Sequence, residues 1–228
     1  MIANRYGYRI AGVHTFGDKG LEITLDTYAK AAKDSPPSAP FAVDHGLMIS
    51  PAVIKKTVAA GAIWSLQVPM FYGRRTSIVS RVFGEDIAHK WSMPVKSLMA
   101  AGVKVTMGAD THDESRAPMH SLQVLVTRQT HDGRVWGAGE KIDRRSALLM
   151  FTRFGAEYVL KSKEIGSIEV GKLADLIILE KNPLDPQVPD DKLKEIKVLQ
   201  TFIGGKIAWD VASGKTSPPA PRAPDPDM

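Results

Sequence analysis

The chain has 228 residues and a formal net charge of +5, with a pI near 9.3. Its lysines and arginines are dispersed, and no basic stretch has the interleaved aromatic residues of a single-strand nucleic-acid platform. No apolar run approaches the ~20 residues of a membrane-spanning helix, and the first residues lack a signal-peptide core. We therefore expect no nucleic-acid partner, no membrane partner and a cytoplasmic location. The absence of cysteine excludes disulfides and thiol catalysis.

Strand and helix patterns alternate through the first two-thirds of the chain, as in βα units. The predicted elements in chain order are strand 8–13, helix 21–33, strand 41–44, helix 51–60, strand 62–66, loop 69–81, helix 90–101, strand 103–107, helix 119–129 and helix 143–154. Two helix starts have specific signals: Ser50 is an N-cap followed by Pro51, and Asp143 caps the last helix. Loop 69–81 is either a substrate-facing lid or a plain surface loop.

The last quarter of the chain has β patterns and then a proline-rich end. A buried strand is predicted within residues 173–180, and residues 198–203 and 206–209 form a hairpin around a glycine pair that supplies positive φ. From residue 217 to the C-terminus there are five prolines and no large apolar residue before the final methionine. This composition predicts a disordered tail.

Three strand patterns lead into residues that can bind a divalent metal: His14, His45 and Asp110. The carboxyl ends of parallel strands meet at one rim of an α/β protein, and active sites form there. Two imidazoles and a carboxylate suit a catalytic zinc-type ion that keeps an open position for water or substrate. Taken singly, each histidine is better explained as a structural residue with a satisfied hydrogen bond, and Asp110 as a turn former or helix cap. Recurrence at three strand ends favours the metal site.

Several segments resemble a known family. Residues 166–179 resemble the segment by which chains of the amidohydrolase superfamily leave their barrel for a small β-sandwich. Residues 14–19, 44–45 and 102–110 resemble the family-3 branch, which includes N-substituted formamide deformylases, and Gln67-Val-Pro69 falls in the same order. The branch usually has Glu-His followed by Ala-Gln, whereas this chain has Asp-His followed by Gly-Leu.

The resemblance implies an incomplete α/β architecture. Such enzymes begin with a strand bearing His-x-His, which occurs nowhere in this sequence, and a complete (β/α)₈ barrel needs about 250 residues. We therefore expect a partial TIM-type barrel containing strands five to eight, followed by a small β-sandwich segment. The implied divisions are a C-terminal barrel half at 1–165, a β-sandwich return segment at 166–212 and a disordered Pro-rich tail at 213–228.

The resemblance also implies a function: a metal-dependent hydrolase acting on C–N bonds of the amide type, of which this chain is the C-terminal part. His14, His45 and Asp110 would bind a divalent metal, most simply zinc, in a site of one or two ions. Asp110 would also be catalytic, taking a proton from water and passing it to the leaving amine. His112 and Arg128 are candidate contacts to a small-molecule amide substrate. A loop histidine without a role and an ion pair on a helix face remain the alternatives for these two residues.

A truncated, non-catalytic remnant or subunit that binds a partner chain is the alternative function, because the His-x-His pair is absent. A half barrel leaves two strand edges and an apolar interior open. We therefore expect a homo-oligomer, a complementing N-terminal chain, or a chain that folds back on itself. Two imidazoles alone hold zinc weakly, so the isolated chain should show little or no activity.

Overall fold

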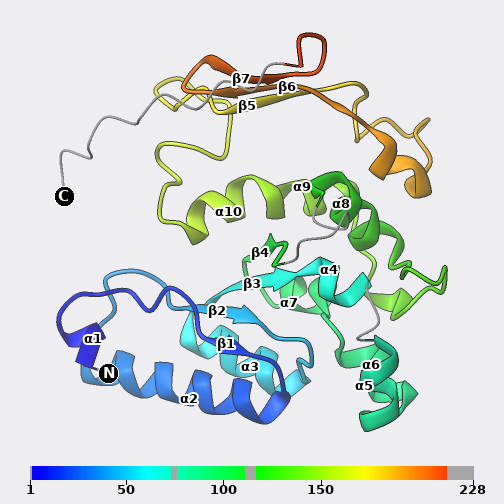
Figure 1. The fold of residues 1–228 in the computed structure, drawn as a ribbon. Helices are drawn as coiled ribbons and strands as arrows, with labels where there is room; N and C mark the ends of the chain where they lie inside the picture. The colour runs from blue at the N-terminus through cyan, green and yellow to red at the C-terminus, as the bar shows by residue number, and fades with distance from the viewer. Residues whose placement is uncertain (1, 73–75, 111–116, 215–228) are drawn as a thin grey trace.

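The computed structural model describes residues 2–72, 76–110 and 117–214 (Figure 1). A four-stranded parallel sheet has the strand order β1-β2-β3-β4, and a three-stranded antiparallel sheet has the order β5-β6-β7. The parallel strands are β1 (His14–Thr15), β2 (Ala42–His45), β3 (Ile63–Gln67) and β4 (Val105–Gly108). The antiparallel strands are β5 (Leu176–Leu179), β6 (Val198–Ile203) and β7 (Lys206–Asp210).

Helices connect the parallel strands and follow the last one. Those before β4 are α1 (Ile2–Arg5), α2 (Asp18–Asp34), α3 (Pro51–Ala60), α4 (Val68–Met70), α5 (Thr76–Phe83), α6 (Glu85–Trp91) and α7 (Val95–Ala100). Those after it are α8 (Pro118–Thr127), α9 (Arg144–Phe151) and α10 (Arg153–Tyr158), with 3-10 helices η3 (Ala138–Glu140) and η4 (Asp190–Glu195). Within the described residues, no helix is long and apolar enough to cross a membrane.

Local signals place the helix ends where the sequence predicts them. The Ser50 hydroxyl accepts a hydrogen bond from the backbone N–H of Val53 at 3.3 Å, and Pro51 occupies the first turn of α3. Gly61 ends α3 with φ 59°, the left-handed conformation common after a helix. The Asp143 carboxylate accepts a hydrogen bond from the Ser146 backbone N–H at 2.9 Å and caps α9.

The register of the parallel sheet gives it one apolar face and one polar face, because in-register residues on neighbouring strands point to the same side. One face carries three aligned residues without solvent exposure: Val43, Trp64 and Val105. The other carries three aligned polar residues: Asp44, Ser65 and Thr106. Figure 1 shows α2 and α3 on one side of β1–β3, where their buried side chains join the core.

The C-terminal helices α9 and α10 cover part of the polar face. The Thr106 hydroxyl donates a hydrogen bond to the Met150 carbonyl of α9 at 2.8 Å. The Tyr158 hydroxyl of α10 donates to the Ala11 carbonyl at 2.9 Å, and the Arg9 guanidinium donates to the Tyr158 carbonyl. The C-terminal part of the chain therefore packs back onto the parallel sheet and its edge chain.

The predicted strand at 8–13 is wrong in its bounds, since β1 contains only His14 and Thr15. Residues Ala42 and Asp44 of β2 nonetheless donate backbone hydrogen bonds to the carbonyls of Ile10 and Val13. The donors are two residues apart and the acceptors three, so the edge chain has one extra residue, as in a bulge. The irregularity lies beside Gly12, where an added Cβ would lie 3.1 Å from the Tyr158 hydroxyl.

Other predicted bounds also need correction. The helix predicted at 90–101 is two helices, because Pro94 cannot continue α6 and Met93 has φ 46°. The helix at 143–154 is likewise divided at Thr152, whose φ and ψ are −121° and −94°. The predicted loop at 69–81 instead contains the last two residues of α4 and most of α5.

The three-stranded sheet confirms the predicted hairpin but not the predicted burial. Gly204 and Gly205 have φ of 58° and 78° between β6 and β7. In β5, Ile177 and Ile178 are 55% and 45% exposed, so this strand is not buried. Figure 1 shows this sheet beyond α9 and α10, where one side has no layer packed on it in the described residues. Most of the predicted tail at 213–228 lies outside the described residues.

The segment before β6 is attached to the helices by polar contacts and two buried side chains. The Arg144 guanidinium of α9 donates to the carbonyls of Pro183 at 3.1 Å and Asp185 at 2.8 Å. Leu193 and Ile196 are buried in the same core as α8. These contacts hold the start of the antiparallel sheet against the α/β part.

Candidate functional site

His14, His45 and Asp110 come together at the carboxyl end of the parallel sheet. The ring centroids of His14 and His45 are 4.2 Å apart, and His45 Nδ1 lies 3.9 Å from Asp110 Oδ2. His14 begins β1, His45 ends β2 and Asp110 follows β4 by two residues. The structure thus brings the three predicted residues together, although the strands are not all neighbours, because β3 lies between β2 and β4.

The three side chains fit a zinc-type ion in the chemistry of their donors, since imidazoles and a carboxylate are its usual ligands. Their arrangement does not form a complete cage. In the described part of the chain, no group of three His, Cys, Asp or Glu side chains is placed to hold a metal ion. The two imidazoles meet edge to face, and Phe16 stacks on His45 with centroids 5.1 Å apart. The donors therefore have suitable chemistry for a metal, but the described residues do not form a complete set.

The backbone at His45 has an uncommon conformation, which a residue of the neighbouring strand β3 stabilises. His45 and Gly46 have φ of 69° and 82°, which places both in the left-handed region. The Trp64 indole N–H of β3 donates a hydrogen bond to the His45 carbonyl at 2.7 Å. A Cβ on residue 46 would lie 2.6 Å from Trp64 Cζ2, so the ring and the strand end fit together only because Gly46 has no side chain.

Asp110 has a different environment from His45. Its side chain is 57% exposed, whereas that of His45 is 8% exposed. Asp110 also has a positive φ, 46°, and non-glycine residues held this way are frequent at functional sites. One edge of the site is therefore buried, and the other is a carboxylate that solvent can reach.

Gln67, at the end of β3, is a further polar residue at this rim. It is 5% exposed, and its Nε2 donates a hydrogen bond to Asp44 Oδ1 at 2.9 Å. Burial raises the pKa of Tyr158, and the nearby Asp44 carboxylate raises it further. The sequence contained a signal for Gln67, because it is the residue directly after the predicted strand 62–66 and begins Gln67-Val-Pro69.

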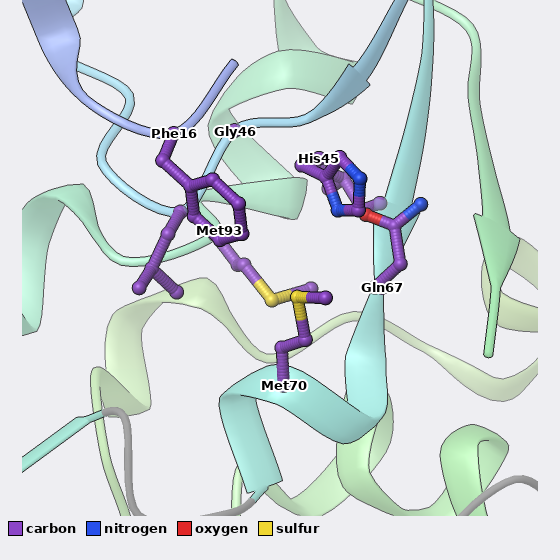
Figure 2. Close-up of a pocket in the computed structure, with 8 residues that line it drawn as sticks. Phe16, His45, Gly46, Gln67, Met70 and Met93 are labelled. Atoms are coloured by element: carbon purple, nitrogen blue, oxygen red, sulfur yellow. The ribbon is translucent and has the colours of Figure 1, made fainter. Parts of the chain in front are cut away.

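A small pocket lies between His45 and Gln67 (Figure 2). Its volume is about 10 Å³, which is space for roughly one water-sized group. Figure 2 shows Gln67 projecting from β3 with its amide oxygen turned toward the His45 ring. Apart from these two side chains the lining is glycine and apolar residues: Phe16, Gly46, Leu47, Leu66, Met70 and Met93.

The two predicted substrate contacts have different outcomes. His112 lies outside the described residues. Arg128 is 1% exposed and follows α8 with φ 60°. Its alternative interpretation, an ion pair on a helix face, does not match the structure, because Arg128 follows the end of α8 and its guanidinium donates to backbone carbonyls.

The contacts of Arg128 are those of a structural anchor. Its guanidinium donates to the carbonyls of Ser92 at 2.9 Å, Met93 at 3.1 Å and Trp136 at 3.1 Å, and lies 3.9 Å over the Phe71 ring. Burial lowers the pKa of Arg128 to about 9, against the opposing attraction of Glu140, so the group is still charged at neutral pH. Contact with a substrate stays a prediction, and the observed partners favour a structural role.

A family model, described as the amidohydrolase family, matches residues 2–208. The chain belongs to the amidohydrolase family. The resemblance to its family-3 branch is thereby confirmed. The chain is 26% identical over 208 residues to N-substituted formamide deformylase of Arthrobacter pascens, with 91% of this chain and 38% of that protein covered. It is 27% identical to Protein LONG AFTER FAR-RED 3 of Arabidopsis thaliana, with 90% and 35% covered.

Known structures resemble this amidohydrolase-family chain in fold. An uncharacterized metal-dependent hydrolase of Pyrococcus horikoshii has a TM-score of 0.67 at 24% identity, with 80% of this chain and 36% of that chain covered. An adenosine deaminase of Xanthomonas campestris with bound zinc has a TM-score of 0.61 at 17% identity, with 91% and 47% covered. The mixed α/β fold with a parallel sheet is thus shared. The chain spans little more than a third of the curated relatives that it matches over most of its length.

Proposed function

We propose that this chain is the C-terminal part of a metal-dependent hydrolase that cleaves C–N bonds of the amide type. The observation that carries the proposal is the convergence of His14, His45 and Asp110 at the carboxyl end of a parallel sheet. Membership of the amidohydrolase family supports it, and two similar proteins are named as a deformylase and a deaminase. We assign residues 1–165 to barrel strands five to eight with their helices, 166–212 to the β-sandwich and 213–228 to a tail.

In the proposed site, His14, His45 and Asp110 would hold a divalent ion, most simply zinc. When bound, such an ion supplies an activated water and polarises the amide carbonyl. The chain's own contribution is orientation and proton transfer. Trp64 fixes the backbone that carries the His45 imidazole. The accessible Asp110 carboxylate accepts a proton from water and delivers it to the leaving nitrogen.

The proposed catalytic unit contains further ligands, because a catalytic zinc site usually has three well-placed protein ligands, and the described residues contain no complete group of three. A complementing chain or a second copy would supply further ligands and pair with the open edge of β1, which ends the sheet order. The isolated chain should then bind zinc weakly and turn over little amide.

A non-catalytic subunit is the second candidate function. It is favoured by one observation: the described residues contain no complete group of three metal-binding side chains. In this case the half sheet would bind a partner chain, and no chemistry would take place at its rim.

The test is an assay of the natural gene product, isolated together with any chain that copurifies. We expect zinc and hydrolysis of N-formyl or N-acyl amines to occur together. Asp110→Asn should lower kcat by about 10²–10⁴-fold while most of the zinc is retained, because the lost function is proton transfer. Asp26→Asn, which changes an exposed carboxylate of α2, is the matched control and should be fully active. Full activity of Asp110→Asn would contradict the assigned role, and a zinc-loaded but inert preparation would favour the second candidate.

A further inference from the structure

The side-chain amide of Gln67 has a fixed orientation. An ionised carboxylate can only accept hydrogen bonds, so the NH₂ group of Gln67 must be the one that faces Asp44, at 2.9 Å. The Ser65 hydroxyl, 3.4 Å from the same nitrogen, lies on the same side. The carbonyl oxygen Oε1 consequently points the other way, toward the His45 ring (Figure 2).

This oxygen is buried and has no hydrogen-bond partner among the residues that the structure describes. Gln67 as a whole is 5% exposed, so bulk water does not solvate the group. Buried polar atoms nearly always have a partner, and a buried acceptor left without one is costly. An oriented, unpaired carbonyl at the wall of a pocket is therefore ready to accept a hydrogen bond from a ligand.

The pocket limits what that ligand can be. It has space for about one water-sized group, and its other walls are mostly apolar, including the thioether side chains of Met70 and Met93. An N–H group fits, because it donates to Oε1 and brings little other polar surface. A carboxylate or a second carbonyl does not fit, because it would place an acceptor against Oε1. The bulk of any substrate must remain outside.

We propose that Gln67 binds the nitrogen end of the substrate, its Oε1 accepting a hydrogen bond from the N–H of the scissile amide. The site then selects primary and secondary amides against tertiary amides, which have no N–H. This inference rests on the proposed function, because the carbonyl of the same amide would face His14, His45 and Asp110. Asp44 and Ser65 hold the acceptor in its orientation before the ligand arrives.

The test is a binding titration of the chain without added metal, followed by the methyl resonances of Met70 and Met93. The two probes are N-methylformamide, which has one N–H, and N,N-dimethylformamide, which has none. We expect the first to bind about tenfold more tightly, since pairing a buried acceptor accounts for a difference of this order. Gln67→Leu should abolish the preference, and Gln187→Leu, at an exposed glutamine, should retain it.

A second variant keeps the inference testable if Gln67→Leu does not fold. Asp44→Asn leaves Gln67 in place but removes the carboxylate that orients its amide, so the preference should fall without vanishing. Equal affinities for the two probes in the wild-type chain would overturn the inference. So would a preference that survives Gln67→Leu, or Met70 and Met93 methyls that respond to neither probe. These readouts need neither zinc nor turnover, so a failure of the proposed function is seen separately.

Discussion

At the scale of single residues, Gly46 decides how the candidate site is held. Its φ of 82° and the closeness of Trp64 leave no space for a side chain. We expect Gly46→Ala to lower the free energy of unfolding by about 2–4 kcal/mol, because left-handed strain and overpacking add. Gly61→Ala, at φ 59° with nothing within 4 Å, carries the strain alone and should cost about 1 kcal/mol. Urea denaturation measures both, and equal losses would show that Trp64 does not constrain the strand end.

A substitution at Arg128 distinguishes a structural role of this residue from a substrate-binding role. Lysine cannot reach the carbonyls of Ser92, Met93 and Trp136 together, so Arg128→Lys should lower the free energy of unfolding by about 2–4 kcal/mol. Arg134→Lys, in the same region but 57% exposed, should change it by less than about 0.5 kcal/mol. If Arg128→Lys instead raised KM for an amide at unchanged stability, the substrate role would hold.

At the scale of elements, the α9 cap predicts a dependence on pH. Hydrogen bonds from Ser146 lower the pKa of Asp143, so the folded state favours the ionised cap. This stabilisation is present above the unfolded-state pKa of about 3.9 and is lost as the pH falls through the folded-state value. Asp143→Ala should cost about 1 kcal/mol at pH 7 and less in acid, as measured by thermal unfolding. A loss that does not change with pH would mean that the carboxylate charge has no part in the cap.

The elements also show how far the sequence predicts this structure. Cap residues and a glycine predict both ends of α3 and the start of α9, because these signals are local in the sequence. The shortened β1 depends on a bulge against its neighbour, and the exposure of β5 depends on what packs on it, so neither is local. The convergence of His14, His45 and Asp110 is predictable from the sequence because each follows an apolar run. The sequence places Gln67 at a strand end, but the orientation of its amide depends on Asp44, a residue of the neighbouring strand, and is not predictable locally.

At the scale of the whole molecule, two surfaces are open to association. The β1 edge has no further strand beside it in the described sheet, and β5 exposes Ile177 and Ile178. Exposed edges and apolar patches favour pairing. We therefore expect light scattering to show a dimer, a complex with a second chain, or concentration-dependent aggregation. A stable monomer at high concentration would show that the packing of α9 and α10 against the parallel sheet is enough to prevent association.

Zinc titration by calorimetry tests the central claim most directly, because it asks whether the converged side chains form a metal site. For the isolated chain we predict weak, saturable binding that does not survive extensive dialysis, since only a partial set of ligands is present. The double variant His14→Ala/His45→Ala should lose this binding, and His89→Ala/His131→Ala, which removes two histidines away from the site, should keep it. Unchanged zinc binding after the loss of His14 and His45 would contradict the account.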